Sequence, residues 1–228
     1  MSITTCIFDA YGTLFDVAAA ARIAAKEPGR EEFAAKWPEI AANWRAKQLQ
    51  YTWLRAVSDT HCDFWRVTQD GLDYALEAAD MTNPELRERL LALYWELSAF
   101  PEVPEMLATL KSAGLNTGIL SNGSPRMLSG AVESAGIGNV LDAVLSVEQL
   151  GVFKPHPSVY RMVDSHFGVQ PKQVLFVSSN GWDASYAAHH GFQTVWVNRS
   201  GEPMDRLPST PQHIMHDLTD IPKLAARL

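Results

Sequence analysis

The chain has 228 residues, of which 46% are hydrophobic and 20% are charged, and its formal net charge is −7. This composition is typical of a globular protein, and the length allows one large domain or a domain with a substantial insertion. The acidic balance, together with the lack of any basic run, argues against general binding to nucleic acid or membrane surfaces.

The cysteine content and the amino terminus indicate a compartment. The two cysteines, Cys6 and Cys62, suit a reducing environment and lack the spacing of zinc ligands. The amino terminus does not read as a signal peptide, and no run of about 18 apolar residues predicts a membrane span. We therefore expect a cytoplasmic protein without membrane or nucleic-acid partners.

Residues 3–8 predict a short buried strand, because the run is mostly apolar and its threonines favour strands. The strand ends at Asp9, and Gly12 then allows the backbone to turn sharply. Open α/β sheets bind ligands at the carboxyl ends of their strands. Asp9 is therefore a candidate site residue, with the capping of a turn or helix as the alternative.

From Val17 to Ser98 the chain is rich in helix-forming residues, and apolar residues recur at helical spacing. Pro38 should kink the second helix or begin a new one, because proline removes a backbone hydrogen bond. Asn83 and Pro84 predict the start of the last helix. The expected helices are residues 18–25, 31–57, 64–79 and 84–97. We interpret 16–98 as a helical insertion that stands apart from the sheet.

Beyond residue 98, segments typical of strands alternate with segments typical of helices, and glycines close several of the helices. The predicted strands are 115–120, 143–146, 174–177, 194–197 and 212–215, and the predicted helices are 101–113, 125–135, 158–167, 184–190 and 221–228. The expected fold is α/β, with a doubly wound, mainly parallel, Rossmann-like sheet between helices. Residues 1–15 and 99–228 would form the core domain, and 16–98 a helical cap domain.

Polar side chains follow four of the predicted strands. They are Asp9 and Tyr11 after the first, Ser121 and Asn122 after the second, Lys154 after the third, and Ser178, Asn180 and Asp183 after the fourth. The carboxyl ends of parallel strands share one edge of the sheet, so these groups can converge. Each has an ordinary alternative, such as a turn or a solvated lysine. Four such clusters on one edge favour a functional site.

This pattern resembles the haloacid dehalogenase (HAD) superfamily over essentially the whole chain. Phosphatases of that family carry Asp-x-Asp after the first strand, whereas this chain has Tyr11 in place of the second aspartate. A phenol, with an ordinary pKa of about 10, cannot replace a carboxylate acid and base near neutral pH. Ser178 and Asn180 also stand where the phosphatases keep metal-binding carboxylates. We therefore expect no metal and no cofactor, since Mg²⁺ prefers carboxylate-rich sites.

Four stretches are similar to the (S)-2-haloacid dehalogenase branch in particular, in the predicted core and in the predicted cap. The chain departs from that branch at Ala46, where glutamine is common, and at Gly181, where alanine is more usual. Both departures bear on the shape of the pocket. The four stretches are Asp9 to Asp16, Lys47 to Arg55, Leu120 to Gly123 and Phe176 to Asp183.

The resemblance implies hydrolytic dehalogenation of short-chain (S)-2-haloalkanoic acids to (R)-2-hydroxy acids. Asp9 is ionised at neutral pH and would attack C2 of the substrate, displacing halide and forming an ester. Water would then hydrolyse that ester. Because halide leaves without a proton, the reaction does not need the general acid that Tyr11 replaces.

The charges of this reaction suggest the supporting residues. The substrate carboxylate, Asp9 and the departing halide are all anionic, so cationic side chains are expected beside them. Lys154 would orient Asp9 and offset its charge, and the resemblance implies that Arg45 receives the halide. The substrate carboxylate would bind at Ser121 and at the backbone N–H groups of Ala10, Tyr11 and Asn122.

Further residues are carried over from the resemblance. Thr13 and Tyr160 would support the site, and Ser178, Asn180 and Asp183 would position the lysine and the hydrolytic water, with Asp183 as the candidate base. An apolar wall around the halogen-bearing carbon would exclude water. It would consist of Tyr11, Leu49, Phe64 and Trp182.

Two other functions remain open at this stage. One is a HAD-type Mg²⁺-dependent phosphatase of a small phosphate ester, and the other is a non-catalytic binding protein with the same fold. The family resemblance also implies a homodimer. The helix that carries Gln48, Tyr51 and Trp53 is a candidate dimer face.

Overall fold

The computed structural model describes residues 2–228. Its centre is a six-stranded sheet in the order β3-β2-β1-β4-β5-β6, and every pair of neighbouring strands is parallel. The strands are Thr5–Phe8 (β1), Asn116–Ser121 (β2), Ala143–Ser146 (β3), Val174–Ser178 (β4), Gln193–Val197 (β5) and His213–Met215 (β6). The predicted α/β fold with a parallel sheet is confirmed.

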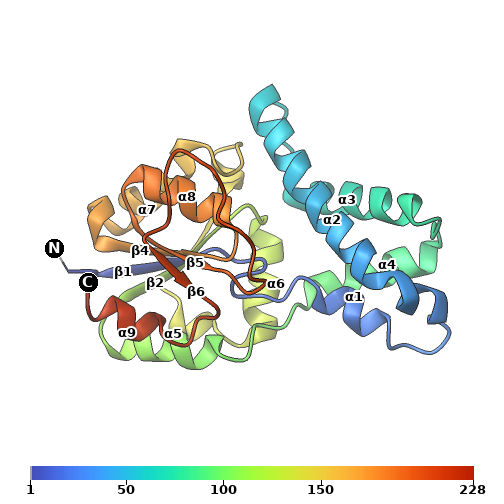
Figure 1. Ribbon diagram of the computed structural model, residues 1–228, viewed down its shortest axis with the longest axis horizontal. Coiled ribbons are helices and arrows are strands. Elements are labelled where there is room, and N and C mark those ends of the chain that lie inside the picture. Colours follow the sequence, from blue (N-terminus) through green and yellow to red (C-terminus); the bar gives the residue numbers. More distant parts are fainter. Residues whose placement is uncertain (1) are drawn as a thin grey trace.

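Helices cover both faces of this sheet, so its central strands are buried throughout. In Figure 1, α7 (Pro157–Phe167) and α8 (Gly181–His190) lie on one face, and α5 (Val103–Ser112) and α9 (Ile221–Ala225) lie on the other. The remaining helix of this part is α6 (Pro125–Ala135), which packs near β3.

The other helices stand beside the carboxyl end of the sheet (Figure 1) and are called the cap here. They are α1 (Ala19–Ala24), α2 (Glu31–Ser58), α3 (Phe64–Ala78) and α4 (Pro84–Trp95). Trp44 on α2 joins α3 by donating from Nε1 to the carbonyl of Thr68 at 2.8 Å. Within residues 2–228, none of the helices combines the length and the apolar character needed to cross a membrane.

The chain leaves and re-enters the sheet domain at adjacent points. The N–H of Asp16 donates to the carbonyl of Ser98 at 3.0 Å, and the N–H of Phe100 donates to the carbonyl of Leu14 at 2.9 Å. The two connecting segments therefore lie side by side. We propose that the domain boundaries fall here, with 16–98 as the cap domain and 1–15 and 99–228 as the core domain.

Two helices bear on the sequence predictions. Helix α2 runs through Pro38, so the proline does not begin a new helix, which was one of its two expected effects. Both Pro38 and Ala34, whose carbonyl loses its usual donor, are exposed, so water can replace the missing bond. Helix α8 begins at Gly181 and not at residue 184. Asn180 is the N-cap residue and has an extended backbone, so the helix starts at the residue that follows it.

Candidate active site

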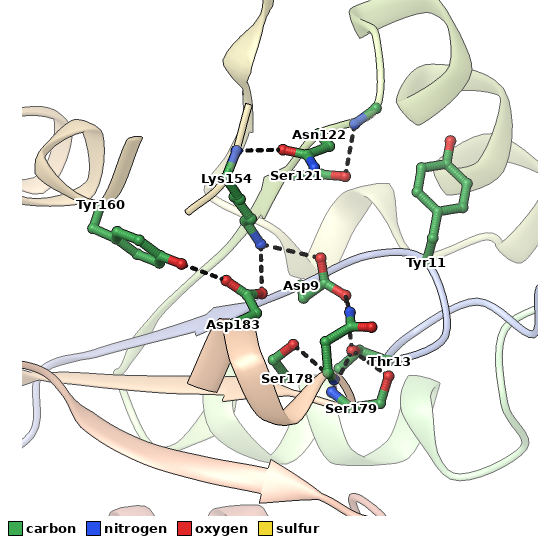
Figure 2. Close-up of polar contacts among 12 residues, drawn as sticks. Asp9, Tyr11, Thr13, Ser121, Asn122, Lys154, Tyr160, Ser178, Ser179 and Asp183 are labelled. Atoms are coloured by element: carbon green, nitrogen blue, oxygen red, sulfur yellow. Dashed lines mark hydrogen bonds and ion pairs between the residues drawn. The ribbon is translucent and has the colours of Figure 1, made fainter. Parts of the chain in front are cut away.

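Lys154 lies at the centre of a buried charge cluster at the carboxyl edge of the sheet. Its Nζ is 3.1 Å from Oδ1 of Asp9 and 2.8 Å from Oδ2 of Asp183, and its side chain is 1% exposed. The hydroxyl of Tyr160 donates to Oδ1 of Asp183 at 2.8 Å. Figure 2 shows these four side chains in a row. Because a buried charge is stable only when it is paired and hydrogen-bonded, the two carboxylates fix the ammonium group in place.

The position of Lys154 depends on a contact with the loop after β2. β3 ends at Ser146, as predicted, and Lys154 comes later, in the segment that follows that strand. The backbone N–H of Lys154 donates to Oδ1 of Asn122 at 2.9 Å, which holds this segment against the sheet edge. A hydrogen bond between residues far apart in the chain therefore fixes the position of the lysine.

The second oxygen of Asp9 has its own donors. Oδ2 accepts from the hydroxyl of Thr13 at 3.0 Å and from Nδ2 of Asn180 at 3.1 Å. With Lys154 on Oδ1, both oxygens are hydrogen-bonded, and Asp9 is only 6% exposed. Charge-assisted hydrogen bonds of this kind fix the orientation of a carboxylate.

Burial and charge determine the protonation of the cluster. Burial lowers the pKa of Lys154, but the carboxylates of Asp183 and Asp9 raise it further, so the net shift is above the ordinary value. Burial raises the pKa of Asp183, against the opposing effect of Lys154. Burial and Asp183 hold the pKa of Tyr160 well above its usual range, so its hydroxyl remains a donor.

Arg45 reaches from α2 to the loops of the core. Its Nη2 donates to Oδ1 of Asn180 at 2.8 Å and to the carbonyl of Tyr11 at 3.3 Å. A Cβ atom at Gly12 would lie 2.7 Å from the same Nη2, and Gly12 has a φ of +88°. The positive φ favours glycine at this turn, because other residues rarely adopt that backbone conformation.

Hydrogen-bond donors without an acceptor in the described residues lie near the ends of β1 and β2. The hydroxyl oxygen of Ser121 accepts from the N–H of Gly123 at 3.0 Å. The backbone N–H groups of Ala10, Tyr11 and Asn122 have no acceptor among residues 2–228. A group of free backbone donors is suited to binding a carboxylate.

A cavity of about 30 Å³ lies between the core and the cap. This is room for about two waters, since one water needs roughly 10–15 Å³ on the same measure. A wider cleft of about 460 Å³ adjoins the cavity and shares Arg45, Leu49, Asn180 and Trp182 with it. The cavity is lined by Asp9, Tyr11, Arg45, Gln48, Leu49, Phe64, Tyr94, Ser121, Asn122, Lys154, Asn180 and Trp182.

The structure brings most of the predicted site residues together. Not all of the residues expected to position Lys154 contact it. Of the residues expected to position the lysine, Asp183 bonds Lys154, whereas Asn180 bonds Asp9 and Arg45. Ser178 is buried, and its oxygen accepts from the N–H of Asn180 at 3.1 Å. Ser178 therefore supports the loop that carries Asn180. Neither Ser178 nor Asn180 hydrogen-bonds to Lys154, so their expected part in positioning the lysine and the hydrolytic water stays a prediction.

The two departures from the family pattern lie outside the cavity. Ala46 is exposed, and Gly181 faces the wider cleft, where a Cβ atom would be 2.7 Å from Oδ2 of Asp205. Their expected effect on the shape of the 30 Å³ cavity is therefore not seen, because neither residue lines it.

Three polar residues near the site were not predicted as site residues. Ser179 donates its N–H to Oγ1 of Thr13 at 2.8 Å, and Gln48 and Tyr94 line the cavity from the cap. Gln48 is 4% exposed, so it cannot belong to the outer dimer face proposed from the sequence. Gln48 lies four residues after Trp44, on the buried face of α2. This helical spacing is the sequence signal that could have identified Gln48 as an inward-facing residue.

Comparison with known proteins gives a consistent result. The family model described as haloacid dehalogenase-like hydrolase matches residues 3–191. The chain is 39% identical over 227 residues to (S)-2-haloacid dehalogenase 1 of Pseudomonas sp. (strain CBS-3), covering 99% of this chain and 98% of that protein. It is 43% identical over 199 residues to the (S)-2-haloacid dehalogenase of Xanthobacter autotrophicus, covering 86% and 76%.

A solved structure is similar over nearly the whole chain. It is the L-2-haloacid dehalogenase from Xanthobacter autotrophicus with chloropropionic acid covalently bound. The TM-score is 0.86 at 36% sequence identity, and the alignment covers 98% of each chain. The similarity includes the cap as well as the sheet.

Proposed function

This chain belongs to the haloacid dehalogenase-like hydrolases, in the branch of the (S)-2-haloacid dehalogenases, and we propose that it hydrolyses short-chain (S)-2-haloalkanoic acids to (R)-2-hydroxy acids. The observation that carries this proposal is the carboxylate of Asp9, held by Lys154 beside a small cavity with aromatic walls. The small volume of the cavity favours short substrates.

In the first step, a carboxylate oxygen of Asp9 attacks C2 of the substrate from the side opposite the halogen. The new C–O bond forms an ester, and the carbon–halogen bond breaks, with its electron pair leaving on the halide. Attack from the opposite side inverts C2, which gives the (R)-hydroxy acid. Lys154 and Arg45 offset the charge of the three anionic groups.

In the second step, water attacks the ester carbonyl carbon of Asp9. Asp183 accepts the proton of that water, and its burial-raised pKa makes it a stronger base than an exposed aspartate. The ester C–O bond to Asp9 breaks, and the departing alkoxide takes the proton from Asp183 and leaves as the hydroxy acid. The carboxyl group of Asp9 then loses its proton to solvent. Asp9 then carries one oxygen from water, and the configuration at C2 is unchanged in this step.

We propose that the reaction needs no metal ion. Lys154 lies between Asp9 and Asp183, at the place where a cation between two carboxylates would bind. Within the described range, residues 2–228, no group of three His, Cys, Asp or Glu side chains has an arrangement suited to a metal. The side chains present therefore do not fit the carboxylate-rich Mg²⁺ site of a phosphatase.

The experiment is halide release from (S)-2-chloropropionate, measured with and without EDTA. A single turnover in H₂¹⁸O is expected to place label in Asp9, and Asp9→Asn is expected to abolish release. EDTA-sensitive phosphate release from a small phosphate ester, without halide release, would instead assign a phosphatase. No turnover of either substrate class by the folded protein would assign a binding protein.

We also propose a cytoplasmic homodimer. Trp53, Leu54 and Val57 on α2 are exposed apolar residues, with Val57 90% exposed. They adjoin a groove of about 420 Å³ that is lined by Trp53, Ala56, Val57, Pro155, His156, Trp182, Tyr186 and Leu207. Exposed apolar surface of this kind is typical of protein interfaces. Both cysteines are free thiols, which suits the cytoplasm.

A further inference from the structure

The direction of attack determines where the halide leaves. Displacement at C2 requires the halide to depart on the side away from Asp9. Asp9 belongs to the core, and the opposite wall of the cavity belongs to the cap. If the proposed function holds, a group that binds the departing halide is therefore expected on the cap.

Three polar side chains of the cap line this cavity, namely Arg45, Gln48 and Tyr94. Nη2 of Arg45 already donates to Asn180 and to the carbonyl of Tyr11. Nε2 of Gln48 donates to Oγ1 of Thr68 at 2.9 Å and to the hydroxyl oxygen of Tyr94 at 3.2 Å. Both N–H groups of that amide are therefore used within the cap.

The hydrogen bonds of the cap have a defined direction. The hydroxyl of Thr68 donates to the carbonyl of Phe64 at 2.9 Å, so its oxygen is available as the acceptor for Gln48. The second N–H of Gln48 then donates to Tyr94, whose oxygen is the acceptor in that bond. Among residues 2–228, the hydroxyl hydrogen of Tyr94 has no acceptor, so the hydroxyl remains free to donate.

Tyr94 is also held rigidly and stays protonated. Its ring lies 5.7 Å from the ring of Tyr11 and 5.0 Å from that of Trp44, and the residue is 3% exposed. Burial raises the pKa of Tyr94 above its ordinary value. A fixed neutral donor in a water-poor site is suited to stabilising charge that appears only in the transition state.

We propose that Tyr94 donates a hydrogen bond to the departing halide, as a donor in addition to Arg45, and that Gln48 is a positioning residue for its hydroxyl. The bond is weak in the ground state, where the halogen is covalently bound. It strengthens as the carbon–halogen bond breaks and negative charge collects on the halogen. The effect is larger for chloride than for bromide, because chloride is the better hydrogen-bond acceptor.

The test is Tyr94→Phe, which removes the hydroxyl and keeps the ring. We expect kcat/KM for 2-chloropropionate to fall by about tenfold or more, as for the loss of a hydrogen bond to a charged group, and kcat/KM for 2-bromopropionate to fall less. The inhibition constant of added chloride should rise. Tyr74→Phe is the matched control, because Tyr74 is an exposed cap residue on α3 and lies outside the cavity.

Gln48→Met tests the positioning role. In the wild type it should cause a smaller loss with the same preference between halogens, and on the Tyr94→Phe background it should add no halogen-selective loss. Equal losses for both halogens in Tyr94→Phe, with unchanged inhibition by chloride, would show a structural role alone and overturn the proposal.

Direct binding separates this proposal from the proposed function. Calorimetric titration with sodium chloride at constant ionic strength requires no turnover. Weaker chloride binding in Tyr94→Phe than in the wild type would support Tyr94 as a halide donor even if no haloacid were hydrolysed. Equal binding would overturn the role of Tyr94 even if the wild type proved to be an active dehalogenase.

Discussion

The guanidinium of Arg45 donates to Oδ1 of Asn180 at 2.8 Å, and the same amide donates from Nδ2 to Asp9 at 3.1 Å. One side chain thus joins the cap to the proposed nucleophile. Because Nδ2 and Oδ1 are both used, the orientation of the amide is determined by its two neighbours. The placement of the cap over the site and the orientation of Asp9 are therefore linked.

Asn180→Asp should disrupt this link. A second carboxylate would then face Oδ2 of Asp9, and like charges at hydrogen-bond distance repel. We expect kcat/KM for 2-chloropropionate to fall by about a hundredfold, since about 2.7 kcal/mol of transition-state stabilisation would be lost. Asn139→Asp, at an exposed position, is the control. Steady-state halide release measures both, and equal activity in the two variants would contradict the prediction.

Lys154→Met should lower both stability and activity. It leaves Asp9 and Asp183 buried without their cation, and breaking a buried pair costs about 3–5 kcal/mol. The control is Lys111→Met, because Lys111 pairs with Asp142 near the surface and such pairs contribute about 1 kcal/mol or less. Urea unfolding at pH 7 compares the two variants. A similar midpoint for both would be evidence against the proposed importance of the buried cluster.

Tyr160→Phe should change the pH dependence of the reaction. Burial raises the pKa of Asp183, and the hydrogen bond from Tyr160 lowers it. Without the hydroxyl, the pKa of Asp183 rises further, so more of the proposed base is protonated at a given acidic pH. The acid limb of the kcat profile should therefore move to higher pH. Tyr74→Phe should leave the limb in place, and a shift to lower pH in Tyr160→Phe would refute the assignment.

Leu49→Ala should widen the substrate range. Leu49 lies at the junction of the small cavity and the wider cleft, and truncation adds space beside the substrate chain. We expect the ratio of kcat/KM for 2-chlorohexanoate to that for 2-chloropropionate to rise by about tenfold, equivalent to roughly 1.4 kcal/mol. Leu54→Ala, on the same helix but exposed, is the control. An unchanged ratio would show that Leu49 does not limit chain length.

Charges on the exposed face of α2 should give a monomer. Leu54→Glu combined with Val57→Glu places two carboxylates on the proposed dimer surface, where both residues are exposed and apolar. Light scattering should then report the mass of one chain, against two for the wild type. Ile23→Glu, an exposed apolar position on α1, should remain dimeric. A wild type that is monomeric at working concentration would exclude the dimer.

Much of the core side of the site could be predicted from the sequence. Alternating helix and strand patterns indicate a parallel sheet, and a parallel sheet brings all strand ends to one edge. The convergence of Asp9, Asn180 and Asp183 follows from that rule. The family resemblance added Arg45, which no local pattern distinguishes from a solvated helix residue.

The pairing of each donor and acceptor was decided only by the tertiary structure. Tyr94 and Gln48 are 46 positions apart, and they meet because the folded cap brings the Tyr94 side chain of α4 against Trp44 and Gln48 on α2. Helical periodicity indicates that a face is buried, but it does not say which side chain lies opposite. Lys154 likewise reaches Asp9 through a loop held by Asn122. The sequence alone determined the sheet and its active edge, whereas the hydrogen-bonded geometry required the folded chain, because these bonds join residues that only packing brings together.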